Sequence, residues 1–176
     1  STSSTWTTLG DGTFDDPASL TAEYIPGTND ISSGNVELIL TADAVSPCTG
    51  VDKDTMNLVF DPLPIAYAGA DDTICVNQSI ILSGQITYST SSTWTTLGDG
   101  TFDDPTSLTA TYTPGTSDQV SGNVELILTA DAVSPCTGVD KDTMNLVFDP
   151  LPIAYAGVDD TICVNQSIIL SGQITY

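Results

Sequence analysis

The chain is a direct repeat of 88 residues. Residues 1–88 align without a gap on residues 89–176, so that every position n corresponds to position n + 88. Seven pairs differ: Ala18/Thr106, Glu23/Thr111, Ile25/Thr113, Asn29/Ser117, Ile31/Gln119, Ser32/Val120 and Ala70/Val158. A fixed period constrains the architecture before any local pattern does, because the fold must tolerate tandem placement. Near-identical units without a spacer suit a stalk or filament better than an enzyme, so we expect a mechanical, non-catalytic role.

The charge balance excludes several function classes. The chain has 23 acidic residues, two lysines and no histidine, for a net charge of −21. Nucleic acids and anionic lipids require basic patches, so neither is an expected partner. The absence of histidine removes the commonest general base. No apolar run reaches 18 residues, which predicts no direct membrane insertion. The sequence has no initial Met and no signal peptide, so we expect it to be part of something longer.

Short apolar and β-branched stretches alternate with Gly-, Pro- and Asp-rich turns, which is typical of an all-β fold. No stretch shows a helical period with caps, and we expect no helix. The strands expected within one period are Ile65–Ala68, Ser79–Leu82, Thr90–Thr96, Leu108–Tyr112, Asn123–Ala130 and Thr143–Phe148. A unit of this size and spacing predicts tandem immunoglobulin-like β-sandwiches.

Three motifs carry a resemblance to a known family. Residues 66–84 look like the opening of a PKD-like, immunoglobulin-type repeat, and residues 94–102 (WTTLGDGTF) are similar to the Trp- and Gly-Asp-Gly-containing core of PKD domains, with Leu97 and a shifted spacing as departures. Residues 108–130 resemble the end of the same domain. The chain as a whole resembles the tandem repeats of giant secreted cell-surface adhesins of Bacteroidetes, of the gliding-motility type. The resemblance implies an extracellular protein.

The resemblance also sets the phase of the repeat. It implies that residues 62–149 form one complete PKD-like sandwich. Residues 1–61 are then the C-terminal part of a preceding repeat, and residues 150–176 the N-terminal part of the next one. The connection at 149–152 is short and contains two prolines, which restrict φ and predict a stiff linker.

The four cysteines, two per period, are expected to form disulfides in an oxidising compartment. They are Cys48, Cys75, Cys136 and Cys163. Zinc is not expected, because the chain has no histidine and no Cys-x-x-Cys. The pairing stays open between Cys75–Cys136 within one domain, a bond from Cys75 to the last loop of the following repeat, and Cys48–Cys75 across the linker.

Other residues are candidates for binding or modification. No cofactor is expected to be required. Calcium, which prefers loop carboxylates, has as candidate ligands Asp11, Asp15, Asp16, Asp99, Asp103 and Asp104. The alternative is that these acids are turn residues. Asp-Thr followed by an apolar residue resembles the O-glycosylation signal of Bacteroidetes secreted proteins, which makes candidates of Thr55, Thr73, Thr143 and Thr161. The alternative is that these aspartates begin strands.

The two tryptophans, Trp6 and Trp94, are expected in the sandwich core, with stacking on a sugar as the alternative. Taken together, the sequence predicts a stalk segment of an extracellular adhesin or surface filament that provides reach and tensile strength. Its partners would be neighbouring repeats of the same chain or filament. Two alternatives remain: a module that binds surface glycans, and a self-assembling filament subunit with exchanged strands.

Overall fold

A computed structural model describes residues 3–176 of the chain. Ser1 and Thr2, which begin the predicted partial repeat 1–61, lie outside the described residues. The chain divides into two compact units, Ser1–Pro62 (unit 1) and Leu63–Tyr176 (unit 2). Strand accounts for 43% of the chain and helix for 7%, so the predicted all-β sandwich class is confirmed.

The described part of unit 1, residues 3–62, contains five strands and one short helix. They are β1 (Ser4–Thr8), β2 (Thr13–Phe14), β3 (Tyr24–Ile25), α1 (Thr28–Ser33), β4 (Asn35–Asp43) and β5 (Val51–Val59). Strand β4 is central in an antiparallel sheet of order β1-β4-β5, and β2 pairs with β3 beside it. Alternating apolar and polar residues in β4 place Val36 and Leu38 on the buried face of this sheet.

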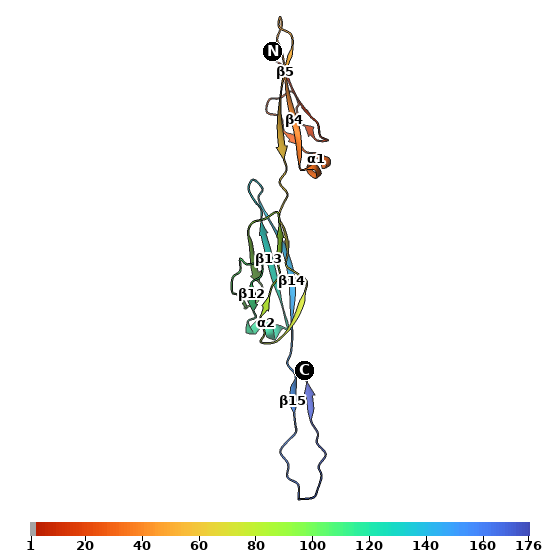
Figure 1. The fold of residues 1–176 in the computed structure, drawn as a ribbon, viewed down its shortest axis with the longest axis vertical. Helices are drawn as coiled ribbons and strands as arrows, with labels where there is room; N and C mark the ends of the chain where they lie inside the picture. The colour runs from red at the N-terminus through yellow and green to blue at the C-terminus, as the bar shows by residue number, and fades with distance from the viewer. Residues whose placement is uncertain (1–2) are drawn as a thin grey trace. The chain divides into compact units, whose positions relative to one another are not determined.

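Unit 2 repeats this arrangement and adds strands from the preceding stretch of sequence (Figure 1). Its elements are β6 (Ile65–Tyr67), β7 (Asp72–Cys75), β8 (Ile80–Ile81), β9 (Gln85–Thr87), β10 (Ser92–Thr96), β11 (Thr101–Phe102), β12 (Thr111–Thr113), α2 (Thr116–Ser121), β13 (Asn123–Asp131), β14 (Val139–Asp149), β15 (Ile153–Tyr155) and β16 (Gln173–Thr175). One sheet has the order β10-β13-β14-β7, in which β7 runs parallel to β14 and the other pairs are antiparallel.

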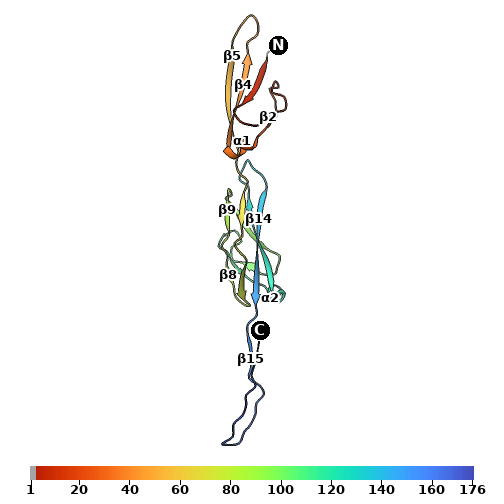
Figure 2. The ribbon, with the colours of Figure 1, turned by 90° about the vertical axis from the view of Figure 1, so that its right-hand side faces the viewer.

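The second layer of unit 2 comprises the sheet β11-β12-β8 and the pair β6-β9. Figure 2 shows β8 and β9 to one side of β14. The core between the layers is built around Trp94, Tyr112, Leu126, Leu128 and Leu146, all less than 2% exposed. Burial of large apolar side chains on this scale is the main stabilising contribution to a small domain.

The aromatic side chains of the core follow the same pattern in both units. In unit 2, Trp94 stacks on Phe102 with ring centroids 6.3 Å apart, and Phe102 tilts against Tyr112 at 5.0 Å. In unit 1 the corresponding separations, from Phe14 to Trp6 and to Tyr24, are 6.2 Å and 5.0 Å. Identical sequence therefore gives the same local geometry twice.

The two helices were not expected from the sequence. Each has six residues, fewer than two turns, so a hydrophobic period cannot show. Gly34 and Gly122 end them in the left-handed conformation, at φ of 78° and 81°, which glycine adopts without the cost of a Cβ. Boundaries also differ from expectation: β14 begins at Val139, before the expected start at Thr143.

Four short strands of unit 2, β7, β9, β11 and β16, were also missed by the sequence analysis. Two to four residues are too few to show alternation. After β14, residues 150–176 form the antiparallel pair β15-β16, in which Ile153 lies opposite Thr175. This pair uses the same register as β6-β9, where Ile65 lies opposite Thr87.

Candidate functional site

The most densely hydrogen-bonded group of unit 1 is the buried carboxylate of Asp30, in the first turn of α1. Its Oδ1 accepts from the backbone N–H of Asp11 at 3.1 Å. Its Oδ2 accepts from the N–H of Gly12 and of Gly27, each at 3.0 Å, and from the hydroxyl of Tyr24 at 2.6 Å. One carboxylate thus ties the Gly10–Gly12 loop, the start of α1 and a core tyrosine together.

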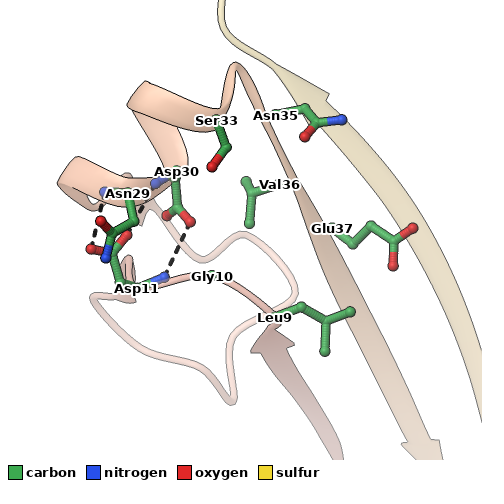
Figure 3. Close-up of a pocket in the computed structure, with 9 residues that line it drawn as sticks. All are labelled: Leu9, Gly10, Asp11, Asn29, Asp30, Ser33, Asn35, Val36 and Glu37. Carbon is green, nitrogen blue, oxygen red and sulfur yellow. Dashed lines mark hydrogen bonds between the residues drawn. The ribbon is translucent and has the colours of Figure 1, made fainter.

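Asp11, in the loop, accepts hydrogen bonds from the helix in turn. Its Oδ1 accepts from the N–H of Asp30 and its Oδ2 from the N–H of Asn29, both at 3.1 Å (Figure 3). These two amides belong to the first turn of the helix, where no intrahelical acceptor is available. The negative charge is also favoured there by the helix dipole. We call this reciprocal arrangement of Asp11 and Asp30 the carboxylate clamp.

The hydrogen bonds shift the ionisation of the clamp and of its tyrosine. The hydroxyl of Tyr24 lowers the pKa of Asp30, with backbone amides adding to the effect and burial opposing it. Burial raises the pKa of Tyr24, and its hydrogen bond to Asp30 acts in the same direction. Both shifts favour the pair that donates and accepts at neutral pH, an ionised carboxylate and a neutral phenol.

Unit 2 has the same clamp, formed by Asp99 and the buried Asp118. The hydroxyl of Tyr112 donates to Asp118 at 2.6 Å. Burial, followed by this hydrogen bond, raises the pKa of Tyr112 to about 12. The backbone N–H of Ser117 is the largest cause of the lowered pKa of Asp99. The sequence analysis missed both buried aspartates. The available signal was weak: glycine is an accepted N-cap residue, and an acidic side chain at the third helical position can accept from the N-cap amide.

Beside each clamp lies an open concavity, of about 510 Å³ in unit 1 and 640 Å³ in unit 2. Figure 3 shows the unit 1 concavity between α1 and β4, with Leu9, Val36 and Glu37 along its wall. The clamp carboxylates at its edge are already engaged by backbone donors. The hydrogen bonds of Asp11 and Asp30 hold the loop and the helix together at this edge.

The remaining calcium candidates lie in turns. Asp15 Oδ1 accepts from the N–H of Asp16 and of Glu23, both at 2.7 Å, and Asp16 Oδ1 accepts from the N–H of Ala18 at 3.1 Å. Asp103 and Asp104 repeat this arrangement in unit 2. Throughout residues 3–176, no group of three or more acidic or cysteine side chains is placed to hold a metal ion. Calcium binding stays an untested prediction.

The cysteines occupy separate places, and no disulfide joins them within the described part of the chain. Cys75 lies opposite Asp149, at the C-terminal end of β14, whereas Cys136 precedes Val139 at its N-terminal end. An 11-residue strand spans ~33 Å, so the Cα atoms of these two residues are far beyond the ~7 Å that a disulfide allows. The alternative of a Cys75–Cys136 bond within one domain is therefore incompatible with the fold.

The other predicted site residues are placed as follows. The four candidate threonines, Thr55, Thr73, Thr143 and Thr161, are all exposed, and their modification stays a prediction. Asp72 begins β7, whereas Asp54 and Asp142 lie inside long strands. Trp94 is 1% exposed at the centre of the unit 2 core, and Trp6 is half-buried in unit 1.

A second feature that sequence reasoning missed is the face of β5. Met56 is 47% exposed, whereas its equivalent Met144 in β14 is 4% exposed. Leu58 and Phe60 are likewise half-buried in unit 1, whereas both equivalents are buried in unit 2. Residues with the same sequence and the same antiparallel partner strand thus form a core in unit 2, where β7 also pairs with β14, and an apolar surface in unit 1.

Comparisons with known proteins support the fold. No protein family and no curated protein matches the sequence. A fragment of mouse cadherin-23, EC22-24, matches with a TM-score of 0.51 at 7% identity, over 86% of this chain and 54% of that one. The human desmocollin-1 ectodomain (TM-score 0.45, 12% identity, 83% and 34% coverage) and the tandem Ig repeats of Dlar (0.38, 11%, 85% and 84%) also match.

The likeness to cadherin-23 is a likeness of fold, because the sequence identity is very low. The chain spans about half the length of that cadherin fragment. The fold is therefore a β-sandwich like that of the cadherin repeats in this fragment. Within residues 3–176, no helix is both long enough and apolar enough to cross a membrane.

Proposed function

We propose that the chain is a non-catalytic, load-bearing segment of a long extracellular adhesin or surface filament. In this proposal residues 62–149 are one complete repeat, residues 1–61 and 150–176 belong to its neighbours, and the surrounding array supplies the partners. The Bacteroidetes gliding-motility adhesins remain the family that the sequence motifs resemble, and the exposed Asp-Thr sites would carry glycans.

The observation that carries the proposal is the path of the chain through unit 2. The backbone N–H of Ala66 donates to Asp140 at 2.9 Å, so the chain enters beside the start of β14. It leaves at Asp149, the end of the same strand, where Cys75 of β7 lies opposite it. Entry and exit are therefore separated by the full length of β14.

The parallel pair β7-β14 then connects the two places at which a pulling force acts, namely where the chain enters and where it leaves unit 2. Pulling on the two ends slides β7 and β14 in opposite directions, which loads their hydrogen bonds together. One of these closing bonds runs from the N–H of Val76 to the carbonyl of Asp149 at 3.0 Å. Loading several bonds at once resists force better than opening them one after another, as a tensile element requires.

Single-molecule force spectroscopy on the full chain tests this proposal. We expect one dominant unfolding event whose length gain corresponds to residues 63–149, about 300 Å at ~3.6 Å per residue. Val76→Pro removes the N–H that bonds to Asp149 and should lower the unfolding force clearly. Val164→Pro changes the equivalent residue of the exposed C-terminal segment and is the matched control. Equal forces in both variants, or a weak event in the unaltered chain, would contradict the load-bearing role.

A further inference from the structure

The apolar face of β14 is covered by a further layer of unit 2. Within the described residues, the equivalent face of β5 in unit 1 has no such layer. In unit 2, the stretch 65–87 supplies this layer, with Ala66, Ala68 and Leu82 all buried against β13 and β14. The layer is fixed by polar bonds as well. The N–H of Ala66 donates to Asp140 at 2.9 Å, and the N–H of Ala68 donates to Asp142 at 2.8 Å.

The receiving groups of unit 1 are present but unused. Asp52 and Asp54 correspond to Asp140 and Asp142, and both are exposed. No backbone amide of the described residues reaches them as Ala66 and Ala68 reach their partners. Together with the exposed Met56, they form a surface whose equivalent in unit 2 binds residues 62–88. The surface of unit 1 is therefore complementary to that sequence.

The chain carries a second copy of that covering sequence. Residues 150–176 repeat residues 62–88 with one change, Val158 for Ala70. In this second copy Leu170 is 80% exposed, whereas its equivalent Leu82 is 2% exposed. The pair β15-β16 already has the register of β6-β9, so part of the docking conformation is formed in advance.

We propose that residues 150–176 of one chain dock on the β4-β5 face of unit 1 in a second copy, as residues 62–88 cover β13 and β14 in unit 2. Ala154 and Ala156 would then donate to Asp52 and Asp54, and Leu170 would cover Met56. This is recognition by addition of strands to an incomplete sandwich.

The two surfaces involved are different, so the contact is heterologous and each added chain leaves one donor and one acceptor free. Such contacts build open, head-to-tail polymers unless the rotation closes a ring. The inference rests on the match between the two copies. In the array of the proposed function the same contact would form between successive repeats of one chain, and the 176-residue chain makes it measurable between two copies. It involves unit 1 and residues 150–176, whereas the force experiment concerns residues 63–149. Failure of assembly and failure under force are therefore separate outcomes.

The test follows the mass of the full 176-residue chain by sedimentation velocity across a thousandfold range of concentration. We expect monomers at the lowest concentration and a growing series of oligomers above it. Leu170→Glu places a charge where Leu82 is buried in unit 2, and should abolish the oligomers. Ile169→Glu is the matched control, because Ile169 is 94% exposed and its equivalent Ile81 stays 72% exposed in the covered unit. It should assemble as the unaltered chain does.

Two further experiments separate a specific contact from general stickiness. Met56→Glu should destroy the docking face of unit 1 and leave residues 150–176 able to dock. Mixing this variant with Leu170→Glu should therefore give heterodimers and no larger oligomers. A synthetic peptide of residues 150–176, added in excess, should reduce the unaltered chain to monomers. Monomers at all concentrations, including closed ones in which the segment folds back on its own unit 1, would overturn the proposal. Equal assembly of the two glutamate variants would overturn it as well.

Discussion

Strand β5 (Val51–Val59) has the same sequence as the first nine residues of β14, residues 139–147. The two strands differ in what covers them. Both pair with their neighbour in the same register: Met56 lies opposite Leu38, and Met144 opposite Leu126. Yet one strand is an exposed surface and the other a core. The antiparallel pairing and its register follow from the local sequence, whereas the parallel pairing with β7 and the burial depend on residues 62–88. The same covering sequence in residues 150–176 is exposed.

The largest expected contrast comes from truncating the same leucine in both units. Leu146 is fully buried, so Leu146→Ala should destabilise unit 2 by ~3 kcal/mol, within the range for buried leucines. Leu58 is half-buried, and Leu58→Ala should cost unit 1 about 1 kcal/mol or less. Urea unfolding followed by Trp94 fluorescence in a Trp6→Phe background reports on unit 2. The difference from the intact chain reports on unit 1. Equal costs would contradict the contrast.

The carboxylate clamp should have a smaller and more equal effect in the two units. Asp118→Ala leaves the N–H of Asp99, the N–H of Gly115 and the hydroxyl of Tyr112 without their acceptor, and should cost ~2 kcal/mol. Tyr112→Phe removes one of these bonds and should cost about 1 kcal/mol. The measurement is again urea unfolding. A clamp variant that leaves the midpoint unchanged would show that the buried aspartate is not structural.

The smallest effect is expected from pH within the neutral range. The pKa values of Asp30, Asp99 and Asp103 are lowered in the fold, so their contribution to stability is present above their unfolded pKa and is lost as the pH falls through the lower folded values. Tyr112 has the opposite sign. Its contribution is present below pH 10 and is lost as the pH rises through about 12.

Thermal unfolding from pH 2 to pH 12 measures this dependence. We expect a flat region between the acid and alkaline limbs. Tyr112→Phe should flatten the alkaline limb more than Tyr24→Phe does, because Tyr112 is fully buried and Tyr24 is half-buried. An alkaline limb that persists unchanged in the Tyr112→Phe variant would assign the loss to another group.

The sequence was sufficient to predict the fold class and the long strands, because alternation over eight or more residues is a strong signal in β4 and β13. It was not sufficient for the short helices or for β7, whose four residues are defined by their parallel partner β14. The candidate acids were identified by type, but Asp30 and Asp118 were missed, because their role depends on a loop about 19 residues earlier in the chain.

The difference in burial between the faces of β5 and β14 could not be predicted from the sequence, for a related reason. Two identical segments have identical local preferences, and only the chain path decides which of them residues 62–88 can reach. The cysteine geometry follows the same rule, since the separation of Cys75 and Cys136 becomes evident only once β7 is placed along β14.

The most direct test of the difference between the two faces is the oxidation of the two methionines by dilute hydrogen peroxide. The four cysteines are alkylated beforehand, so that oxygen added to the intact mass comes from the methionines. The experiment is done at a concentration where the chain is monomeric. Oxidation depends on access to the thioether. We expect one fast equivalent from Met56 and one slow equivalent from Met144. Met56→Leu should remove the fast phase, and excess peptide 150–176 should slow it. Two methionines that oxidise at the same rate, with or without the peptide, would contradict the claim that one face is covered and the other is open.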